Sequence, residues 1–440
     1  MIKFLLLFPA LLFGAYSGQI INKSNCASVA GAVVSDAHQS VTTDESGNFS
    51  IDTSATHLNV KAYGFRPERI EVLPYFSKHA VRPIDVKALY LSFWGARINS
   101  KTLERIMKII DETEINAIVV DVKNEFGLTS YKTDVHTANR HGIWYQRTIK
   151  DIEKFMELMN SKDIYMIARV VVFKDELQAE NHPERALKLE DGEIWRNREK
   201  MAWVDPYDQK SHDYTLAIAE DAAKVGFDEI NFDYIRFPAK SDLSYSKENN
   251  QSNRIEAIGS FLSSAQDLLR PYGTFISVDT YGYVCWNKND TNIGHTVASL
   301  AKHADYLAPM LYPSGFNVGA LGHDDPTQHS YDIVARSILR MHKNIDPIRV
   351  RPWLQSFKDY AHSRKHYTEK RIAEQIQAAQ ESATSGWMLW NPSSRYKYVN
   401  EKLFEKHLPA ENIRLLPKEN PLFEEHTEPS ELEELSYKAG

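Results

Sequence analysis

The sequence predicts an α/β protein, a (β/α)8 barrel preceded by a small N-terminal all-β sandwich domain, and three observations support this prediction. Between residues 86 and 407, eight apolar, β-rich runs alternate with amphipathic stretches, which is typical of parallel strands joined by crossover helices. Residues 28–80 instead show short segments of alternating apolar and polar residues, broken by turns. The chain has 440 residues, 42% of them hydrophobic, which is enough for a large core.

Charge and cysteine content exclude several classes of protein. The 52 Lys and Arg and the 59 Asp and Glu residues give a formal net charge of −7 without a basic stripe, so we expect no nucleic-acid partner. Two cysteines exclude a disulfide-built scaffold and a CxxC zinc or redox motif, and we expect Cys26 and Cys285 to be free thiols. Aromatic residues make up 11% of the chain, and sugar rings stack on aromatic faces.

Residues 1–17 have the features of a secretory signal peptide. Lys3 precedes an apolar run from Phe4 to Ala15, and the small residues Ala15 and Ser17 stand at cleavage-like spacing. The run is too short to span a bilayer comfortably, and no later segment approaches about 18 consecutive apolar residues. We therefore expect an exported protein, periplasmic or extracellular, that begins near Gly18 and has no integral membrane segment.

The segments on either side of the predicted barrel differ from it in pattern. Residues 28–80 contain GAVVSDAHQSVTTDESGNFSI, which resembles the carboxypeptidase regulatory-like β-sandwich module, and this resemblance implies a domain without an active site. Residues 409–440 are acidic, rich in Pro and without periodicity, which predicts a disordered tail.

The eight apolar runs have the length and composition of buried strands. They cover residues 88–96, 116–124, 164–173, 229–238, 275–283, 306–314, 349–357 and 386–394. Eight such β-α units predict a closed barrel. An open doubly wound sheet is the alternative, but it would be expected to carry a Gly-rich first turn, and neither GxGxxG nor GxxxxGK[ST] occurs in the sequence.

Three aspartates stand late in apolar runs, where parallel strands of a barrel reach the active site. They are Asp121 in DVKNE, Asp233 in NFDYIRFP and Asp279 in SVDTYG. A carboxylate inside an apolar strand is costly unless it is paired or used in chemistry. Glycoside hydrolysis uses two carboxyl groups, one as acid and one as nucleophile or base. For any one of the three, a cap or a structural ion pair is the alternative.

Several motifs resemble one bacterial glycoside hydrolase family whose barrels are distantly similar to α-amylase and α-galactosidase barrels. They are AWVDPYDQKSHDYTLAIAEDAAKVGFDEINFDYIRFP, NAIVVDVKNEFG, SVDTYG and DYLAPMLYPS, and the resemblance spans nearly all of residues 86–398. In related barrels the nucleophile is the fourth-strand Asp, which implies this role for Asp233. Related families place the acid/base on the fifth or sixth strand. The sixth strand here ends in MLYPS without a carboxylate, which leaves Asp279.

Further residues are candidates for substrate binding. Arg236 follows Asp233 and is expected either to keep it ionised or to form an ion pair at the barrel rim. Asp121 is a candidate for binding sugar hydroxyls or tuning Asp233, and Asp205 either reaches the site from the loop after the third strand or caps a helix. Four aromatic residues are candidate stacking platforms, with core packing as the alternative for each. They are Trp94, Tyr281, Tyr312 and Trp390.

Other functions fit the sequence less well. A metal-dependent barrel hydrolase would need an HxH motif on an early strand, and none occurs on a strand, so we expect neither metal nor other cofactor. A phosphate-binding barrel would have Gly-rich loops after its last two strands, which here read LQSF and NPSS. A non-catalytic carbohydrate- or envelope-binding barrel remains the serious alternative. The loss of a catalytic carboxylate would mark it, whereas both Asp233 and Asp279 are present.

Overall fold

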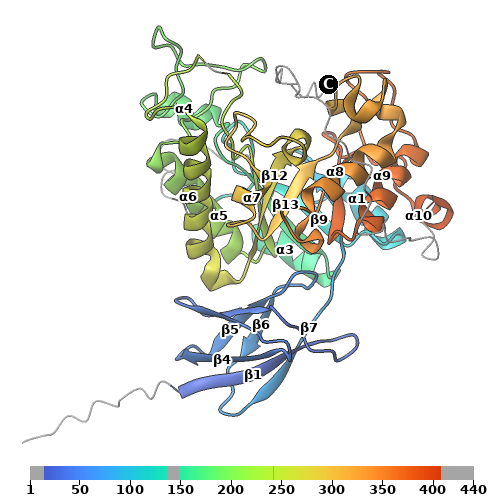
Figure 1. Ribbon diagram of the computed structural model, residues 1–440. Helices are drawn as coiled ribbons and strands as arrows, with labels where there is room; N and C mark the ends of the chain where they lie inside the picture. The colour runs from blue at the N-terminus through green and yellow to red at the C-terminus, as the bar shows by residue number, and fades with distance from the viewer. Residues whose placement is uncertain (1–13, 134, 136–147, 241, 408–440) are drawn as a thin grey trace, which may run out of the picture. The chain divides into compact units, whose positions relative to one another are not determined.

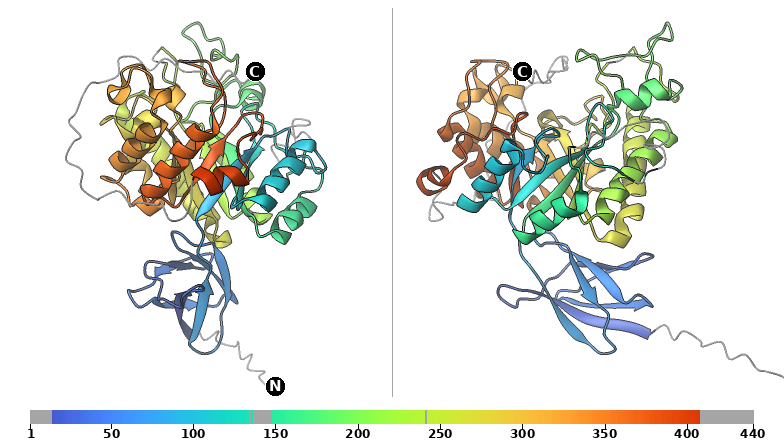
Figure 2. Two further views of the ribbon diagram at one scale, coloured as in Figure 1. Left: turned by 90° about the vertical axis from the view of Figure 1, so that its right-hand side faces the viewer. Right: turned by 180° about the vertical axis from the view of Figure 1, so that it is seen from behind.

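The computed structural model describes residues 14–133, 135, 148–240 and 242–407. They form two compact units. The first ends at Ile84 and also includes Arg270–Gly273, and the second contains the remaining residues. The predicted tail at residues 409–440 lies outside the described residues, and each unit is described by itself (Figures 1 and 2).

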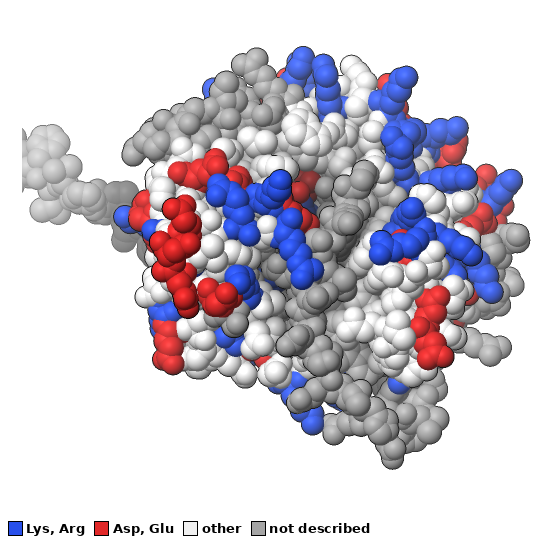
Figure 3. Space-filling model, turned by 90° about the horizontal axis from the view of Figure 1, so that it is seen from above, with Lys and Arg blue, Asp and Glu red and all other residues white. Residues whose placement is uncertain are grey.

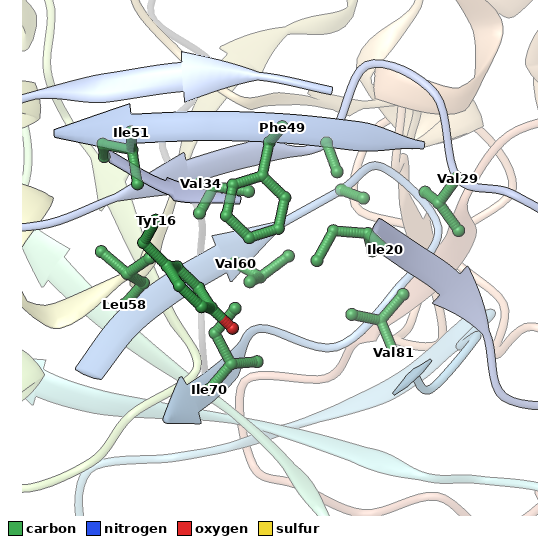
Figure 4. Packing of buried hydrophobic residues seen from close by; sticks show 12 residues of the cluster. Tyr16, Ile20, Val29, Val34, Phe49, Ile51, Leu58, Val60, Ile70 and Val81 are labelled. Atoms are coloured by element: carbon green, nitrogen blue, oxygen red, sulfur yellow. The ribbon is translucent and has the colours of Figure 1, made fainter. Parts of the chain in front are cut away.

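The N-terminal unit contains two β-sheets that share one hydrophobic core. One sheet has the order β4-β1-β7 and the other β3-β2-β5-β6. The strands are β1 (Gly14–Asn22), β2 (Val33–Ser35), β3 (Ser40–Thr42), β4 (Asn48–Thr53), β5 (His57–Lys61), β6 (Glu68–Glu71) and β7 (Ser77–Val81). Figure 4 shows Tyr16 and Phe49 of the first sheet among Val34, Leu58 and Val60 of the second. A small β-sandwich, as predicted, is therefore present.

Strand β1 begins before the predicted sandwich range of 28–80. It pairs antiparallel with β4 and parallel with β7, and it includes Gly14–Ser17, the end of the predicted signal peptide. The Tyr16 side chain is buried, and its hydroxyl lies 2.7 Å from Ser77 Oγ and 2.6 Å from His79 Nε2. The predicted range misses this strand because its first residues continue the apolar N-terminal run, which hides their strand character.

The second unit is a closed barrel of eight parallel strands, and it confirms the predicted fold. The strand order is β10-β11-β12-β13-β14-β15-β8-β9. The strands are β8 (Val86–Leu91), β9 (Ala117–Lys123), β10 (Tyr165–Val171), β11 (Glu229–Asp233), β12 (Phe275–Tyr281), β13 (Tyr306–Met310), β14 (Trp353–Gln355) and β15 (Gly386–Trp390). Each falls within or overlaps one of the eight apolar runs. They bury nearly every residue because barrel strands are covered on both faces.

Helices form the outer layer around these strands (Figures 1 and 2). They are α1 (Lys101–Glu112), α3 (Ile152–Ser161), α4 (Glu176–Asn181), α5 (Gln209–Lys224), α6 (Gln251–Leu269), α7 (Val297–Leu300), α8 (Ser330–Met341), α9 (Glu369–Glu381) and α10 (Glu401–His407). N-cap side chains stabilise the first turn of several helices. Ser100 accepts from the Leu103 N–H, Asp208 from the Ser211 N–H and Thr368 from the Arg371 N–H. No helix among the described residues is long and apolar enough to cross a membrane. Both cysteines are free, Cys26 exposed and Cys285 buried.

The barrel closes between β15 and β8 at a glycine that no other residue can replace without strain. Gly386 is the register partner of Val86 and has a φ of +99°, in the region that favours glycine. A Cβ at Gly386 would lie 2.0 Å from the Val86 carbonyl oxygen. Close backbone approach therefore fixes this residue type at the seam.

We expect Gly386→Ala to lower the free energy of unfolding of the barrel by clearly more than Gly192→Ala. Gly192 also has a positive φ, of +87°, but a Cβ there would meet no atom within 4 Å, so only the backbone cost of about 1–2 kcal/mol applies. Denaturant unfolding followed by tryptophan fluorescence measures this, because all eight tryptophans lie in the range Trp94–Trp390. Equal losses in the two variants would show that the seam tolerates a side chain.

Candidate active site

A pocket of about 420 Å³ opens at the carboxyl ends of the barrel strands. Figure 3 shows the molecule from above, and Lys, Arg, Asp and Glu side chains lie on this face. The pocket is lined by Tyr90, Ser92, Phe93, Trp94, Asp121, Asn124, Glu125, Phe126, Arg169, Lys174, Asn197, Arg198, Glu199, Met201, Asp233, Tyr234, Arg236, Asp279, Tyr281, Met310, Tyr312, Trp390 and Pro392. Most come from strand ends and the loops that follow them, which is where barrel enzymes place their sites.

The structure brings together all but one of the candidate residues named from the sequence. Those in the pocket wall are Trp94, Asp121, Asp233, Arg236, Asp279, Tyr281, Tyr312 and Trp390. Asp205 is not among the lining residues. Its two carboxylate oxygens accept from the backbone N–H groups of Tyr207, at 3.0 Å, and Ser246, at 2.7 Å. Asp205 therefore takes neither predicted role, because helix α5 is capped by Asp208 and Asp205 instead holds two loops together.

Arg169, at the end of β10, binds two of the three strand-end aspartates. Its Nη1 donates to Asp121 Oδ1 at 2.6 Å, and its Nε and Nη2 donate to Asp233 Oδ2 at 3.0 and 2.5 Å. Burial opposes its charge, but the charges of Asp121 and Asp233 raise the pKa of Arg169 well above its ordinary value. One permanently charged guanidinium therefore balances carboxylates on both neighbouring strands.

The expectation that Arg236 keeps Asp233 ionised is wrong in its choice of residue. Arg236 forms no ion pair with Asp233, and its Nη1 donates to the Phe237 carbonyl oxygen at 3.0 Å. The backbone changes direction at Tyr234, whose φ of +50° is unusual for a residue with a side chain. This left-handed residue ends the strand directly after Asp233. Arg169, on the neighbouring strand, supplies the positive charge instead.

The turn at Tyr234 also holds Asp233 in place. The Tyr234 N–H donates to Asp233 Oδ1 at 2.7 Å, so each carboxylate oxygen of Asp233 accepts from a fixed donor. The backbone carbonyl of Asp233 accepts from the Val172 N–H at 2.8 Å. Strain in a left-handed residue costs on the order of 1–3 kcal/mol and is found where surrounding structure fixes a functional group.

A β-bulge separates the side chains at the end of β9. The register with β10 shifts between Arg169 and Val170, which face Asp121 and Lys123 and leave Val122 as the extra residue. Asp121 lines the pocket, whereas Lys123 lies 2.8 Å from the buried Asp175 and 5.9 Å from the ring of Tyr214 in helix α5. The bulge thus lets two residues of the same strand serve the pocket and the helix layer.

Asp279 has a different environment from Asp233, although Phe232 and Val278, the residues before them, are register partners. Both of its hydrogen bonds fall on Oδ1, from Asn231 Nδ2 at 2.8 Å and Trp353 Nε1 at 2.7 Å. No cation forms an ion pair with it among the described residues. Burial, together with the negative charge of Asp233, raises the pKa of Asp279 well above its ordinary value. At a given pH this carboxyl group is therefore protonated to a greater extent than an exposed aspartate.

Asp121 binds two neighbouring side chains, those of Arg169 and Tyr90. Burial raises the pKa of Asp121, with Arg169 opposing this effect. Its Oδ2 accepts from the Tyr90 hydroxyl at 2.5 Å, so both of its oxygens are bound by side chains. Asp121 thus anchors Arg169 and Tyr90, and its oxygens are less accessible to a substrate than the sequence pattern indicated.

The four candidate stacking residues differ in exposure. Trp94 is 63% exposed at the pocket wall. Trp390 instead stacks on Tyr90 with ring centroids 3.9 Å apart, and the Arg169 guanidinium lies 5.1 Å from its ring. Tyr312 is buried and packs against Phe357. Trp94 is therefore the one of the four best placed as an open platform, and Phe126, 45% exposed at the same pocket, joins it.

Several lining residues were missing from the sequence-based site. Arg169 stands late in a Val- and Ile-rich run, which was a usable signal for a functional side chain. Lys174 and Glu199 form an ion pair in the pocket wall, but Glu199 comes from a long loop whose course the sequence does not reveal. No group of three or more His, Cys, Asp or Glu residues suited to a metal ion occurs among the described residues.

Comparison with known proteins identifies a family. Residues 88–396 match the sequence profile of a family described as "Putative glycosyl hydrolase domain". The glycoside hydrolase domain of PgaB (BpsB) from Bordetella bronchiseptica is similar in structure, with 12% identity, a TM-score of 0.55 and coverage of 74% of this chain and 100% of that chain. Alpha-L-fucosidase isoenzyme 2 from Paenibacillus thiaminolyticus gives 12% identity, a TM-score of 0.51 and coverage of 74% and 49%. At such identities the two structures show a shared barrel fold.

A "hypothetical protein from Ruminiclostridium thermocellum ATCC 27405" is 33% identical over 43% of this chain and 96% of that chain, with a TM-score of 0.39. No curated protein matches the chain.

The raised pKa of Asp279 predicts an effect of pH on stability. Between the unfolded pKa of about 3.9 and the higher folded pKa, the folded state binds a proton that the unfolded state has lost, so stability falls as pH rises. Asp279→Asn keeps an oxygen acceptor and removes this cost. We therefore expect its free energy of unfolding to increase, relative to the unsubstituted chain, as pH rises above about 4.

Asp359 provides a control of opposite sign. Burial opposes its charge, but hydrogen bonds from Ala361 N–H, Ser363 Oγ and His362 N–H lower the pKa of Asp359 to about 2. Its stabilising contribution is complete above the unfolded pKa of about 3.9 and is lost as pH falls through about 2. Asp359→Asn should therefore be least stable, relative to the unsubstituted chain, near neutral pH. A difference for Asp279→Asn that does not vary with pH would contradict the assignment.

Proposed function

The chain belongs to this glycosyl hydrolase family, and we propose that it cleaves the O-glycosidic bonds of a poly- or oligosaccharide with Asp233 as nucleophile and Asp279 as acid and base. One observation carries the proposal. Two strand-end carboxyl groups share a pocket, yet a guanidinium binds one while burial without an ion pair favours protonation of the other. Unequal protonation of two carboxyls is what glycoside hydrolysis requires.

The reaction proceeds in two displacements. A carboxylate oxygen of Asp233 attacks the anomeric carbon while the Asp279 proton passes to the departing glycosidic oxygen, which leaves as an alcohol. The product is a glycosyl ester of Asp233 and an ionised Asp279. Asp279 then removes a proton from water, which attacks the same carbon and releases the sugar and the Asp233 carboxylate. Arg169 compensates the negative charge on Asp233 before attack and after release.

Strand geometry favours retention of configuration. Phe232 and Val278 are register partners, so Asp233 and Asp279 follow them at one level of adjacent strands. Adjacent strands lie about 4.8 Å apart. That spacing is near the roughly 5–5.5 Å between the carboxyl groups of retaining enzymes and below the roughly 6.5–9.5 Å of inverting ones. We therefore assign the covalent, retaining route.

The N-terminal sequence supports export as part of the same proposal. The apolar run after Lys3 has the pattern of a signal peptide. Because Tyr16 is buried in the core of the β-sandwich, we expect cleavage to leave it in the mature chain, ahead of the start near Gly18 that the sequence indicates. N-terminal sequencing of the exported protein tests both points. A mature chain that begins at Gly18 would contradict the expected cleavage before Tyr16. Retention in the cytoplasm with an intact N-terminus would contradict export.

Two substitutions separate the roles of the carboxyl groups. Asp233→Asn should reduce kcat by about 10⁴-fold or more on every substrate while leaving sugar binding nearly intact, because the near-isosteric amide cannot act as the nucleophile. Asp279→Asn should reduce hydrolysis of natural glycosides by about 10²–10⁴-fold but spare aryl glycosides, whose acidic phenols leave without protonation. Steady-state kinetics on a glycan and on its nitrophenyl glycoside measure both effects.

Asp213→Asn is a matched control, since Asp213 is exposed on helix α5 and is not among the pocket-lining residues. Its activity should be unchanged. Equal losses of Asp279→Asn on both substrate types would remove Asp279 from the acid role. Sugar binding without turnover in the unsubstituted chain, across glycans that bind, would support a non-catalytic carbohydrate-binding barrel instead.

A further inference from the structure

Arg236 has a setting unlike that of the other buried cations in the pocket wall. Arg169 pairs with Asp121 and Asp233, and Lys174 pairs with Glu199. Arg236 is only 6% exposed, yet no carboxylate lies within ion-pair distance of it among the described residues. One hydrogen bond to a backbone carbonyl, that of Phe237, is its single described side-chain hydrogen bond.

Aromatic rings surround this guanidinium. Its central carbon lies 4.6 Å from the ring centroid of Tyr281, 4.9 Å from that of Trp203 and 5.4 Å from that of Tyr234. Cation–π contacts contribute roughly 0.5–2 kcal/mol. Burial of an ion costs several kcal/mol even after relaxation, so the rings position the guanidinium without compensating its charge.

The unused donors of Arg236 are reachable from the pocket. Arg236 is a lining residue of the same pocket as Asp233 and Asp279. Its Nε and Nη2 have no described hydrogen-bond partner, and they are not among the buried polar atoms sealed from solvent without a partner. A buried cation with open N–H donors at a pocket wall is suited to an anionic group of a ligand.

We propose that the sugar bound in this pocket carries a carboxylate, as a uronic acid unit does, and that Arg236 binds it. This inference rests on the proposed glycoside hydrolase function and adds its substrate class. Guanidinium N–H groups match the two oxygens of a planar carboxylate in a bidentate pair. Tyr281 and Trp203 restrict the guanidinium in advance, so less side-chain freedom is lost on binding. A neutral sugar would leave the charge of Arg236 uncompensated.

Binding to the Asp233→Asn variant tests the inference, because the bound oligosaccharide then stays intact. The probes are uronate-containing oligosaccharides, the same oligosaccharides with their carboxyl groups reduced to alcohols, and neutral oligosaccharides bearing a sulfate ester. Calorimetry should give at least a tenfold lower Kd for an acidic oligosaccharide than for its reduced counterpart. Equal affinity within every pair, binding of none of the acidic probes, or an equal preference for the sulfate ester would overturn the carboxylate assignment.

Variants of Arg236, made on the Asp233→Asn chain, identify the residue responsible. Arg236→Gln should abolish the preference for the acidic member, and Arg236→Lys, which keeps the charge but not the bidentate donors, should retain only part of it. Arg340→Gln is the matched control, since Arg340 lies 5.7 Å from the ring of Trp286 and is not among the pocket-lining residues. It should keep the full preference. If Arg236→Gln fails to fold, the Arg236→Lys result decides, and an undiminished preference there overturns the role of Arg236.

The outcomes distinguish a failure of this inference from a failure of the proposed glycoside hydrolase function. Hydrolysis of neutral glycans without preference for acidic ones would overturn the acidic substrate and leave the Asp233 and Asp279 mechanism standing. Binding of acidic oligosaccharides that the unsubstituted chain never hydrolyses would retain the Arg236 site and reject the hydrolase mechanism.

Discussion

The guanidinium of Arg169 is the interaction on which the active site depends. Strand β10 lies between β9 and β11, so one side chain reaches Asp121 on one side and Asp233 on the other. Without it, two carboxylates would stand in a buried pocket wall with no adjacent positive charge, at a cost of several kcal/mol for each ion. The left-handed Tyr234, which directly follows Asp233, supports this arrangement, because its N–H donates to the other oxygen of the carboxylate that Arg169 binds.

The two aspartates differ because Arg169 forms an ion pair with Asp233 and not with Asp279. Arg169 binds Asp233 directly, whereas Asp279, on the next strand, accepts neutral N–H donors from Asn231 and Trp353 at one oxygen. Burial and the nearby negative charge then raise the pKa of Asp279. Two residues of one type on adjacent strands thus have different electrostatic environments, and the opposite roles proposed for them rest on this difference. The proposed binding of a substrate carboxylate by Arg236 rests on a similar imbalance, since this guanidinium has no ion-pair partner within the described part of the chain.

The sequence could predict what depends on pattern and could not predict what depends on local backbone geometry. The barrel, its eight strands and the clustering of Asp121, Asp233 and Asp279 followed from apolar runs with late polar residues. The partner of Asp233 did not, because the turn at Tyr234 takes Arg236 away while Arg169 arrives from another strand. The sequence also could not predict which aromatic side chains are exposed: Trp94 is exposed to solvent, whereas Trp390 stacks on Tyr90. Asp205 shows the limit of motif reading, since its two backbone hydrogen bonds join two loops, whereas its sequence context indicated a pocket residue or a helix cap.

Unequal protonation of the two carboxyl groups is the central claim, and infrared difference spectroscopy tests it without any knowledge of the sugar. The spectrum of the unsubstituted chain at neutral pH, minus that of Asp279→Asn, should contain the carbonyl stretch of a protonated carboxylic acid. The corresponding difference for Asp233→Asn should contain the bands of an ionised carboxylate. A protonated Asp233 together with an ionised Asp279 would reverse the assigned roles, and two ionised carboxylates would contradict the mechanism.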